Sequence, residues 1–80
     1  MKNLLEYILI HLVDNPEDVT IELKEDDDLT TYIIHVNPDD IGRVIGKKGS
    51  IINSIRNIAK VRAVKEGVRV RVEVDSQDND

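Results

Sequence analysis

Cysteine is missing from this chain, and its absence removes several chemistries at once. Without thiols there is no disulfide framework, no thiolate metal site and no cysteine nucleophile. We therefore expect a reducing, cytoplasmic setting. Phenylalanine and tryptophan are missing as well, so the core must be aliphatic. The only aromatic residues, Tyr7 and Tyr32, fall in segments with core-like patterning.

Long hydrophobic runs are also missing. The most apolar stretch, residues 4–13, is interrupted by Glu6 and His11 and is too short to span a bilayer. No small-residue cleavage site follows it, which argues against a signal peptide. Hydrophobic residues make up 40% of the chain and charged residues 34%, a balance that over 80 residues is typical of one small globular domain with modest stability.

Positive charge is scarce overall, and the formal net charge is −5. Taken alone, this argues against nucleic acid as a partner, because phosphate binding needs a basic surface. The distribution along the chain reverses that inference. Residues 41–71 hold nine basic side chains and one acid, a net charge of +8, which leaves −13 for the rest. Charge runs are usually solvated faces, but segregation this strong favours a localised anion site.

Hydrophobic periodicity predicts one helix and two strands in the first half of the chain. Apolar residues at helical spacing indicate a helix over residues 2–13, which ends at residues 14–16 because the residue before a proline avoids the helical region. Alternation indicates a strand over residues 19–24, and a second strand follows over residues 29–36. The acidic link at residues 25–28 predicts an antiparallel hairpin. Its three aspartates lack the spacing of a calcium loop, so we expect no metal site there.

The second half of the chain predicts two helices and a third strand. Asn37 is a suitable cap, Pro38 suits the first helical position, and the two aspartates that follow favour the positive end of the helix dipole. This helix ends at Gly46, and a second helix follows until residues 65–67 break it. Alternating valines then predict a strand over residues 68–74. The apolar stripe expected on the second helix consists of Ile51, Ile52, Ile55, Ile58 and Ala59.

These elements define an α+β fold in the order helix, strand, strand, helix, helix, strand, which we assign to one domain over residues 1–74. We expect one three-stranded sheet with the helices packed on one face. The second and third strands are separated by two helices, a connection long enough for a parallel pair with a right-handed crossover, so the sheet should be mixed. Residues 75–80 are acidic and lack apolar side chains, which predicts a disordered tail.

The loop between the two later helices, Gly46, Lys47, Lys48 and Gly49, carries the strongest chemical signal. Amide hydrogens at the start of the second helix have no partner within the helix and, with the dipole, favour an anion. Glycine at both ends lets a sugar-phosphate backbone approach, and the two lysines supply charge. Gly42 widens the same approach. An ordinary corner between helices is the structural alternative, because a two-glycine pattern alone is weak evidence.

Two other nucleotide-binding interpretations fit less well. A phosphate-binding P-loop needs a glycine where Ile41 stands and a hydroxyl where Lys48 stands, so that pattern fails at two positions. A helix-turn-helix DNA reader needs a solvent-facing recognition helix, whereas Ile51, Ile52 and Ile55 are expected inside. We therefore rank both below the binding of a sugar-phosphate backbone at residues 46–49.

Residues 41–52 resemble the KH-domain signature, which has the core Ile-Gly-x-x-Gly-x-x-Ile. The residues that match this core are Ile45, Gly46, Gly49 and Ile52. Because a helix and a strand precede it, the chain resembles a type II KH domain and, in its length, the KhpA family of small bacterial single-KH RNA-binding proteins. The resemblance covers about residues 2–74. It implies single-stranded RNA as the ligand, a role as an RNA chaperone or post-transcriptional regulator, and a homodimer or a pairing with a larger KH protein of the KhpB or Jag type.

The resemblance also implies roles for individual positions. Residues 46–49 would clamp the backbone of about four nucleotides. The bases would lie in a groove lined by Ile41, Val44, Ile45 and Ile52. The expected RNA-binding residues are Gly42, Arg43, Ile45, Gly46, Lys47, Lys48, Gly49, Ser50, Asn53 and Arg56. No aromatic residue is expected near the loop, so binding should be weak, with a logarithmic salt slope of about −1.5 to −3 for roughly two to four phosphate contacts.

Nothing in the sequence suggests catalysis or a bound cofactor. His11 and His35 lie far apart and lack a third ligand at metal spacing. Ser50, Ser54 and Ser76 have no acid-base pair beside them. We therefore expect no enzymatic activity, no metal and no cofactor. The remaining alternative is a protein-interaction module, in which the same helices form a dimer surface and nucleic-acid contact is incidental.

Overall fold

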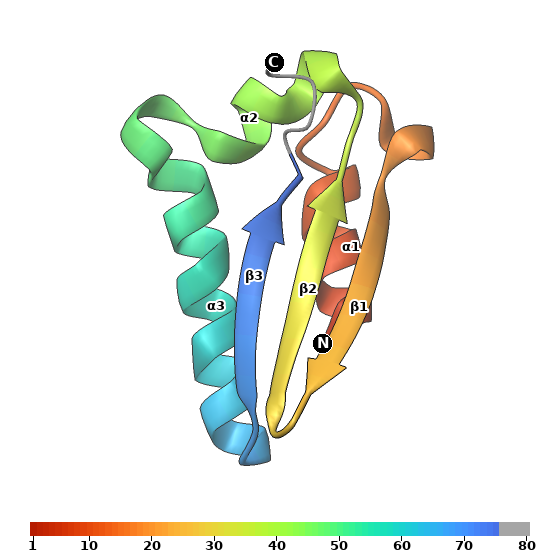
Figure 1. Cartoon of the computed structure of the whole chain (residues 1–80). Helices are drawn as coiled ribbons and strands as arrows, with labels where there is room; N and C mark the ends of the chain where they lie inside the picture. Colours follow the sequence, from red (N-terminus) through yellow and green to blue (C-terminus); the bar gives the residue numbers. More distant parts are fainter. Residues whose placement is uncertain (76–80) are drawn as a thin grey trace.

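The order of elements in the computed structural model is the predicted one (Figure 1). The structure describes residues 1–75. The helices are α1 (Lys2–Ile10), α2 (Ile41–Ile45) and α3 (Ser50–Glu66), and the strands are β1 (Thr20–Asp26), β2 (Leu29–His35) and β3 (Arg69–Val74). Single 3₁₀ turns at Pro16–Asp18, Pro38–Asp40 and Lys47–Gly49 precede β1, α2 and α3.

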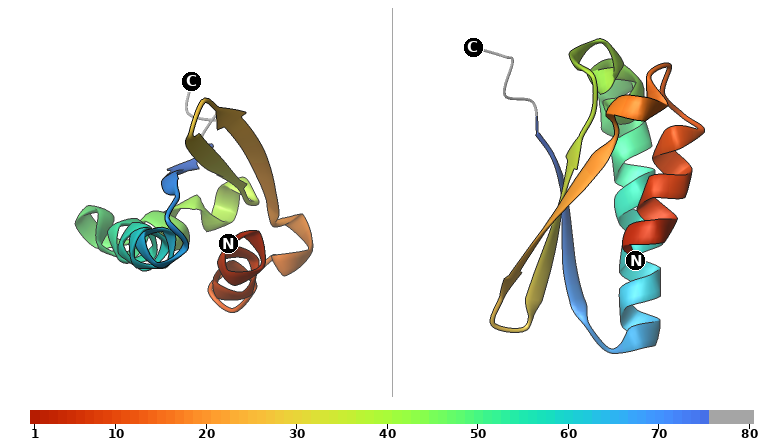
Figure 2. Two further views of the ribbon diagram at one scale, coloured as in Figure 1. Left: turned by 90° about the horizontal axis from the view of Figure 1, so that it is seen from below. Right: turned by 90° about the vertical axis from the view of Figure 1, so that its right-hand side faces the viewer.

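The three strands form one sheet in the order β1-β2-β3. β1 and β2 are antiparallel, with Thr20 opposite His35, and β2 and β3 are parallel, with Leu29 opposite Arg69. Figure 2 shows the helices on one face of this sheet, so the predicted α+β fold with a mixed sheet is confirmed. β3 is an edge strand, and α3 lies beside its free edge (Figure 1).

Asp75 extends the sheet by one residue beyond β3. Its amide donates to the carbonyl oxygen of Ile34 (2.8 Å), and its carboxylate lies 3.0 Å from Nδ1 of His35. The first residue of the predicted tail is therefore attached to the sheet. The disorder predicted for the remainder concerns residues 76–80, which lie outside the described residues.

The core fills the space between the helices and the sheet and is almost entirely aliphatic. Its buried members are Leu5, Leu9, Val13, Ile21, Tyr32, Ile34, Val44, Ile52, Ile55, Ala59 and Val72. Of the two aromatic residues, Tyr32 joins this core, whereas Tyr7 is 62% exposed on α1. Tyr7 is therefore outside the core, although the apolar pattern of its segment is typical of core residues.

Two apolar residues that were expected inside lie outside. Ile58 is 45% exposed, because the line of α3 that faces the core runs through Ile55, Ala59 and Ala63, and Ile58 lies about 100° around the helix axis from Ala59. Leu23 is 46% exposed, although it shares with the buried Ile21 the face of β1 that the alternation predicts to be inside. Both errors arise where an apolar residue lies at the margin of a packed face.

Candidate nucleic-acid interface

The loop between α2 and α3 turns sharply because glycine adopts backbone angles that other residues avoid. Gly46 has φ 77° and ψ 172°, and Gly49 has φ 76° and ψ 15°. A Cβ at Gly46 would overlap with the side chain of Ile51 and would lie 2.8 Å from the Ile51 amide nitrogen. Gly46 is therefore required both by its positive φ and by the close approach of α3.

The start of α3 presents backbone donors that no side chain caps, because its N-cap residue is Gly49 and the first turn contains no acid. The amides of Gly49 and Ser50 donate to the carbonyls of Gly46 and Lys47 in the preceding 3₁₀ turn, which leaves the next amides of the first turn of α3 for an anion. Lys47 and Lys48 are exposed beside this turn, and neither forms an ion pair with any residue from 1 to 75. Uncapped amides, the dipole of a 17-residue helix and two ammonium groups thus act on the same volume, which makes it favourable for an anion.

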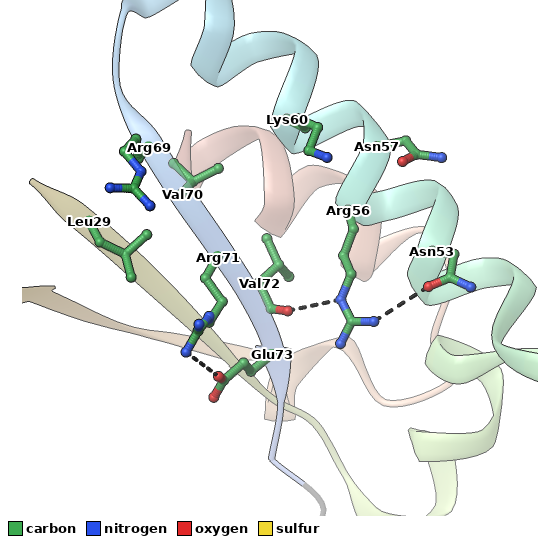
Figure 3. A pocket seen from close by; sticks show the side chains of 10 residues that line it. All are labelled: Leu29, Asn53, Arg56, Asn57, Lys60, Arg69, Val70, Arg71, Val72 and Glu73. Carbon is green, nitrogen blue, oxygen red and sulfur yellow. Dashed lines mark hydrogen bonds and ion pairs between the residues drawn. The ribbon is translucent and has the colours of Figure 1, made fainter.

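A groove of about 770 Å³ lies between α3 and the free edge of β3 (Figure 3). One wall consists of Asn53, Arg56, Asn57 and Lys60 of α3, and the other of Leu29, Arg69, Val70, Arg71, Val72 and Glu73. Four of these side chains are cationic and one is acidic. Because cationic side chains outnumber the one acid, the groove favours a polyanion.

Arg56 connects the two walls of the groove (Figure 3). Its Nε donates to the carbonyl oxygen of Val72 (3.0 Å), and its Nη1 donates to Oδ1 of Asn53 (3.4 Å). The Val72 carbonyl therefore points away from β2, and the amide of the same strand residue points the same way. The groove thus contains a backbone donor as well as cations, and such a donor can meet the hydrogen-bonding edge of an unstacked base.

Most of the predicted RNA-binding residues come together on this surface. Residues 46–49 form the loop, Ser50 is exposed at the start of α3, and Asn53 and Arg56 lie in the groove wall. Gly42 is exposed one turn before the loop, and a Cβ added there would meet nothing within 4 Å. The loop and the groove therefore form one surface, and both are reached from the start of α3.

Other predicted positions are engaged elsewhere. Nη2 of Arg43 lies 2.9 Å from the carboxylate of Asp14, so this guanidinium is already paired. Val44 is fully buried and Ile52 is 4% exposed, so the prediction that they line a groove was wrong. Because α2 has only five residues, its apolar face is needed to close the core. Ile45, in contrast, is only half-buried.

Sequence reasoning missed the part of the groove farther from the loop. Asn57 and Lys60 lie four residues after Asn53 and Arg56, so one more turn of the same helical period would have found them. The β3 wall had no comparable signal, because the placement of β3 beside α3 is a tertiary contact. The alternating pattern predicts only that the arginines of β3 face away from the core. It does not predict that α3 lies next to them.

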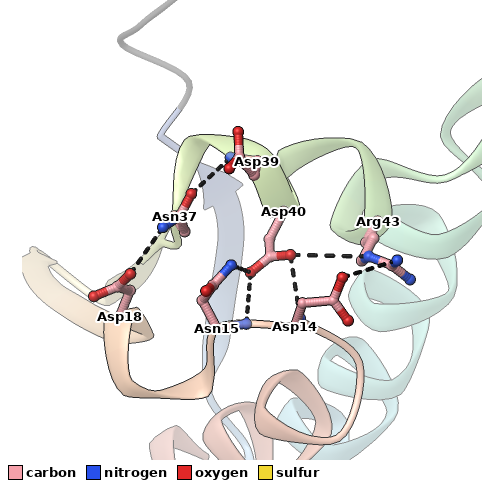
Figure 4. A network of polar contacts seen from close by, with 7 residues as sticks. All are labelled: Asp14, Asn15, Asp18, Asn37, Asp39, Asp40 and Arg43. Atoms are coloured by element: carbon pink, nitrogen blue, oxygen red, sulfur yellow. Dashed lines mark hydrogen bonds and ion pairs between the residues drawn. The ribbon is translucent and has the colours of Figure 1, made fainter.

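Asp40 anchors the helix that leads into the loop (Figure 4). It is 1% exposed, and its carboxylate accepts hydrogen bonds from the amides of Asp14 (3.1 Å) and Asn15 (3.0 Å) and from Nδ2 of Asn15 (3.0 Å). Nε of Arg43 lies 3.9 Å away. Burial alone would raise the pKa of Asp40, but these hydrogen bonds and the charge of Arg43 outweigh it and hold the pKa below its ordinary value.

The cap predicted before α2 is confirmed, and it also makes a longer connection. Oδ1 of Asn37 accepts a hydrogen bond from the amide of Asp39 (2.8 Å), with Pro38 following the cap. Nδ2 of Asn37 donates to the carboxylate of Asp18 (2.9 Å; Figure 4). The segment before α2 is therefore connected to the α1-β1 link by this contact and by those of Asp40.

Comparison with known proteins assigns this arrangement to a family. The KH domain of the KhpA/KhpB family matches residues 2–74. The chain belongs to this family. Among its relatives are the RNA-binding proteins KhpA of Clostridium perfringens and Clostridium acetobutylicum, which are 42% and 43% identical over 74 residues covering 92% of this chain and 99% of each relative. The RNA-binding protein KhpA of Halalkalibacterium halodurans is 38% identical over 74 residues, or 92% of this chain and 97% of the relative.

Membership of the family confirms the resemblance to type II KH domains and fits the element order described above. The relatives are named for RNA binding, which agrees with the expectation of a binding protein. No solved structure matches the chain. Over residues 1–75, no helix has the length and apolar character needed to cross a membrane.

Proposed function

We propose that this chain binds single-stranded RNA, with the sugar-phosphate backbone held at residues 46–49 and the adjoining nucleotides in the α3-β3 groove. The observation that carries the proposal is the anion site at the loop, where uncapped amides and two lysines meet an approach that glycine leaves open. The RNA-binding relatives support the choice of ligand. A groove between one helix and one strand edge suits a single strand, whose bases are free to turn into it.

The physical character of the site favours a general RNA-binding role. Neither aromatic residue is part of the loop or the groove walls, so base stacking contributes little and sequence preference is weak. Such binding needs no cofactor and suits an RNA chaperone or post-transcriptional regulator in the cytoplasm. We propose that role for the chain.

A double charge reversal at the loop tests the proposal. Lys47→Asp with Lys48→Asp removes both ammonium groups and places two carboxylates beside the start of α3, so binding of a fluorescent single-stranded oligoribonucleotide should fall below detection in an anisotropy titration. The circular dichroism spectrum should not change, because both side chains are exposed.

The matched control is Lys2→Asp with Lys24→Asp. It changes the net charge by the same amount on α1 and β1, and both lysines are exposed and outside the groove. It should retain most of the affinity, with a small loss from the altered overall field. Equal affinity of the loop variant and the wild type would reject the proposed site.

A second candidate function, association with another KH chain, is favoured by one observation. Ile58 and Val61 lie on the outward face of α3, 45% and 63% exposed, where a solvated helix usually carries polar residues. Buried against a second copy, or against a larger related chain of the KhpB type, these side chains would leave water. We propose a homodimer or such a heterodimer through this face of α3.

A further inference from the structure

A second, smaller cavity continues the groove at the end far from the loop. It has a volume of about 230 Å³ and is lined by Lys60, Ala63, Val64, Val68, Arg69 and Val70. Lys60, Arg69 and Val70 also line the larger groove, so the two cavities share a boundary. We call the smaller one the distal pocket.

The end of α3 builds this pocket. Gly67 has φ 71°, its amide donates to the carbonyl of Val64 (3.2 Å), and the amide of Val68 donates to the carbonyl of Ala63 (3.0 Å). This pair of bonds is the Schellman motif, which places the residue after the glycine against the last turn of the helix. Val68 is therefore held next to Ala63, and the pocket has a fixed apolar surface.

The apolar surface is unusually exposed for a helix end. Val64 is 74% exposed and Val68 is 47% exposed. Valine is also a weaker helix former than the lysine, glutamate or arginine that usually fills a solvated position. Neither packing nor helix propensity therefore accounts for valine at position 64, whereas contact with a flat apolar partner would.

Two cations stand at the rim of this surface. Lys60 forms no ion pair with the described residues, 1–75. Arg69 lies 3.7 Å from the carboxylate of Asp28, but both side chains are more than 70% exposed, and a pair of that kind is weak and exchangeable. Both cations are thus available to a phosphate.

We infer that the distal pocket holds a nucleotide of the same RNA strand, with its base against Val64 and Val68 and its phosphate between Lys60 and Arg69. The inference rests on the proposed function and extends the RNA-binding site beyond the loop. It explains the exposed valines and the two cations with one ligand, because a nucleotide combines an apolar face with a negative charge.

Spacing along α3 sets the length of RNA that the site requires. Lys60 lies ten residues after Ser50 and Val64 fourteen, which at about 1.5 Å per residue corresponds to roughly 15 and 21 Å. A stacked strand advances about 3.4 Å per nucleotide, so roughly four to six nucleotides separate the loop from the pocket. An oligomer of ten nucleotides therefore reaches both sites, whereas a stacked tetramer bound at the loop does not.

The test compares tetrameric and decameric oligoadenylate, whose bases stack, on the wild type and on Lys60→Gln with Arg69→Gln. Loss of the one phosphate contact at the pocket should lower affinity for a single strand about fivefold near 0.1 M salt, so the double variant should bind the decamer at least about fivefold more weakly. Its affinity for the tetramer should fall less than its affinity for the decamer, because Lys60 and Arg69 also line the far end of the larger groove. Lys24→Gln with Lys65→Gln removes the same charge outside both cavities and should change neither affinity substantially.

A second measurement examines the apolar surface. In NMR titrations, the amide resonances of Ala63 and Val64 should move with the decamer and stay in place with the tetramer, and Val64→Asn should reduce decamer affinity while Ile10→Asn on α1 does not. Equal losses for both oligomers, or unmoved resonances, would overturn the distal pocket while leaving the loop site intact. A wild type that binds neither oligomer would overturn the proposed function as well.

Discussion

Gly46 shows how one residue can determine the form of the whole site. Its φ of 77° is a backbone angle at which a residue with a side chain is strained. In addition, α3 approaches so closely that a Cβ would overlap with Ile51. Gly42, four residues earlier, is the opposite case: it lies inside α2, and nothing lies within 4 Å of the place where a Cβ would stand. The two glycines should therefore respond oppositely to the same substitution.

We expect Gly46→Ala to lower the free energy of unfolding by at least about 1–3 kcal/mol, the usual cost of a side chain at such backbone angles, with a further loss from the overlap with Ile51. Gly42→Ala should instead raise it by about 0.5–1 kcal/mol, because alanine loses less conformational freedom in a helix. Urea denaturation followed by circular dichroism measures both changes. Equal stabilities for the two variants would show that the loop does not have the backbone described here.

At the scale of elements, Asp40 holds α2 and the segment after α1 in a fixed relation. Asp40→Asn keeps the shape of the side chain but replaces one acceptor by a donor, opposite the amides of Asp14 and Asn15. We expect the midpoint of thermal unfolding to fall by several degrees near neutral pH. Asp39→Asn is the matched control, since Asp39 is exposed and its carboxylate has no hydrogen-bond or ion-pair partner among residues 1–75, and its midpoint should match the wild type.

The difference between wild type and Asp40→Asn should also depend on pH. The pKa of Asp40 is lower in the folded protein than its ordinary value of 3.8, so the ionised carboxylate contributes stability that is fully present above 3.8. That contribution is lost as the pH falls through the folded-state pKa. Thermal unfolding across an acid series should therefore show the difference in midpoint shrinking below about pH 4. A difference that stays constant with pH would mean that ionisation of Asp40 does not stabilise the fold.

Elements and loop could be predicted from the sequence because their signals are local. Alternation found the strands, helical spacing found the helices, and the glycines flanking Lys47 and Lys48 located the loop. The role of Asp40 could not be predicted in the same way, because its partners lie 25 and 26 residues away in the chain. The helix dipole offered a local explanation for this acid, and the tertiary contacts supplied a different one.

The groove was predicted incompletely for a related reason. Hydrophobic periodicity predicts on which face of its own helix or strand a residue lies. It does not predict which other helix or strand packs against that face. Asn53 and Arg56 were found because they adjoin the loop, whereas the positions of Arg69 and Arg71 depend on β3 pairing with β2 and lying beside α3. Val44 was assigned to the groove although the core needed it.

At the scale of the whole molecule, α3 carries two different surfaces. Arg56 and Lys60 face the groove, while Ile58 and Val61 face outward. Around the helix axis, Ile58 lies about 160° from Lys60 and Val61 about 100° from it. A partner chain seated on the outward face would therefore leave the groove open, so that association and RNA binding are compatible.

Val61→Asp tests association independently of RNA binding. A carboxylate buried without a partner at a contact between two chains is strongly unfavourable, so this variant should sediment as a monomer at concentrations where the wild type forms a dimer. Its affinity for a tetranucleotide should equal that of the wild type, because Val61 lies outside the groove. Tyr7→Asp on α1 introduces the same charge at a residue of similar exposure, 62% against 63%, and should remain a dimer. Two results would contradict a dimer through the outward face of α3. One is a wild type that sediments as a monomer across the whole concentration series, with and without RNA. The other is a Val61→Asp variant that sediments as the wild type does.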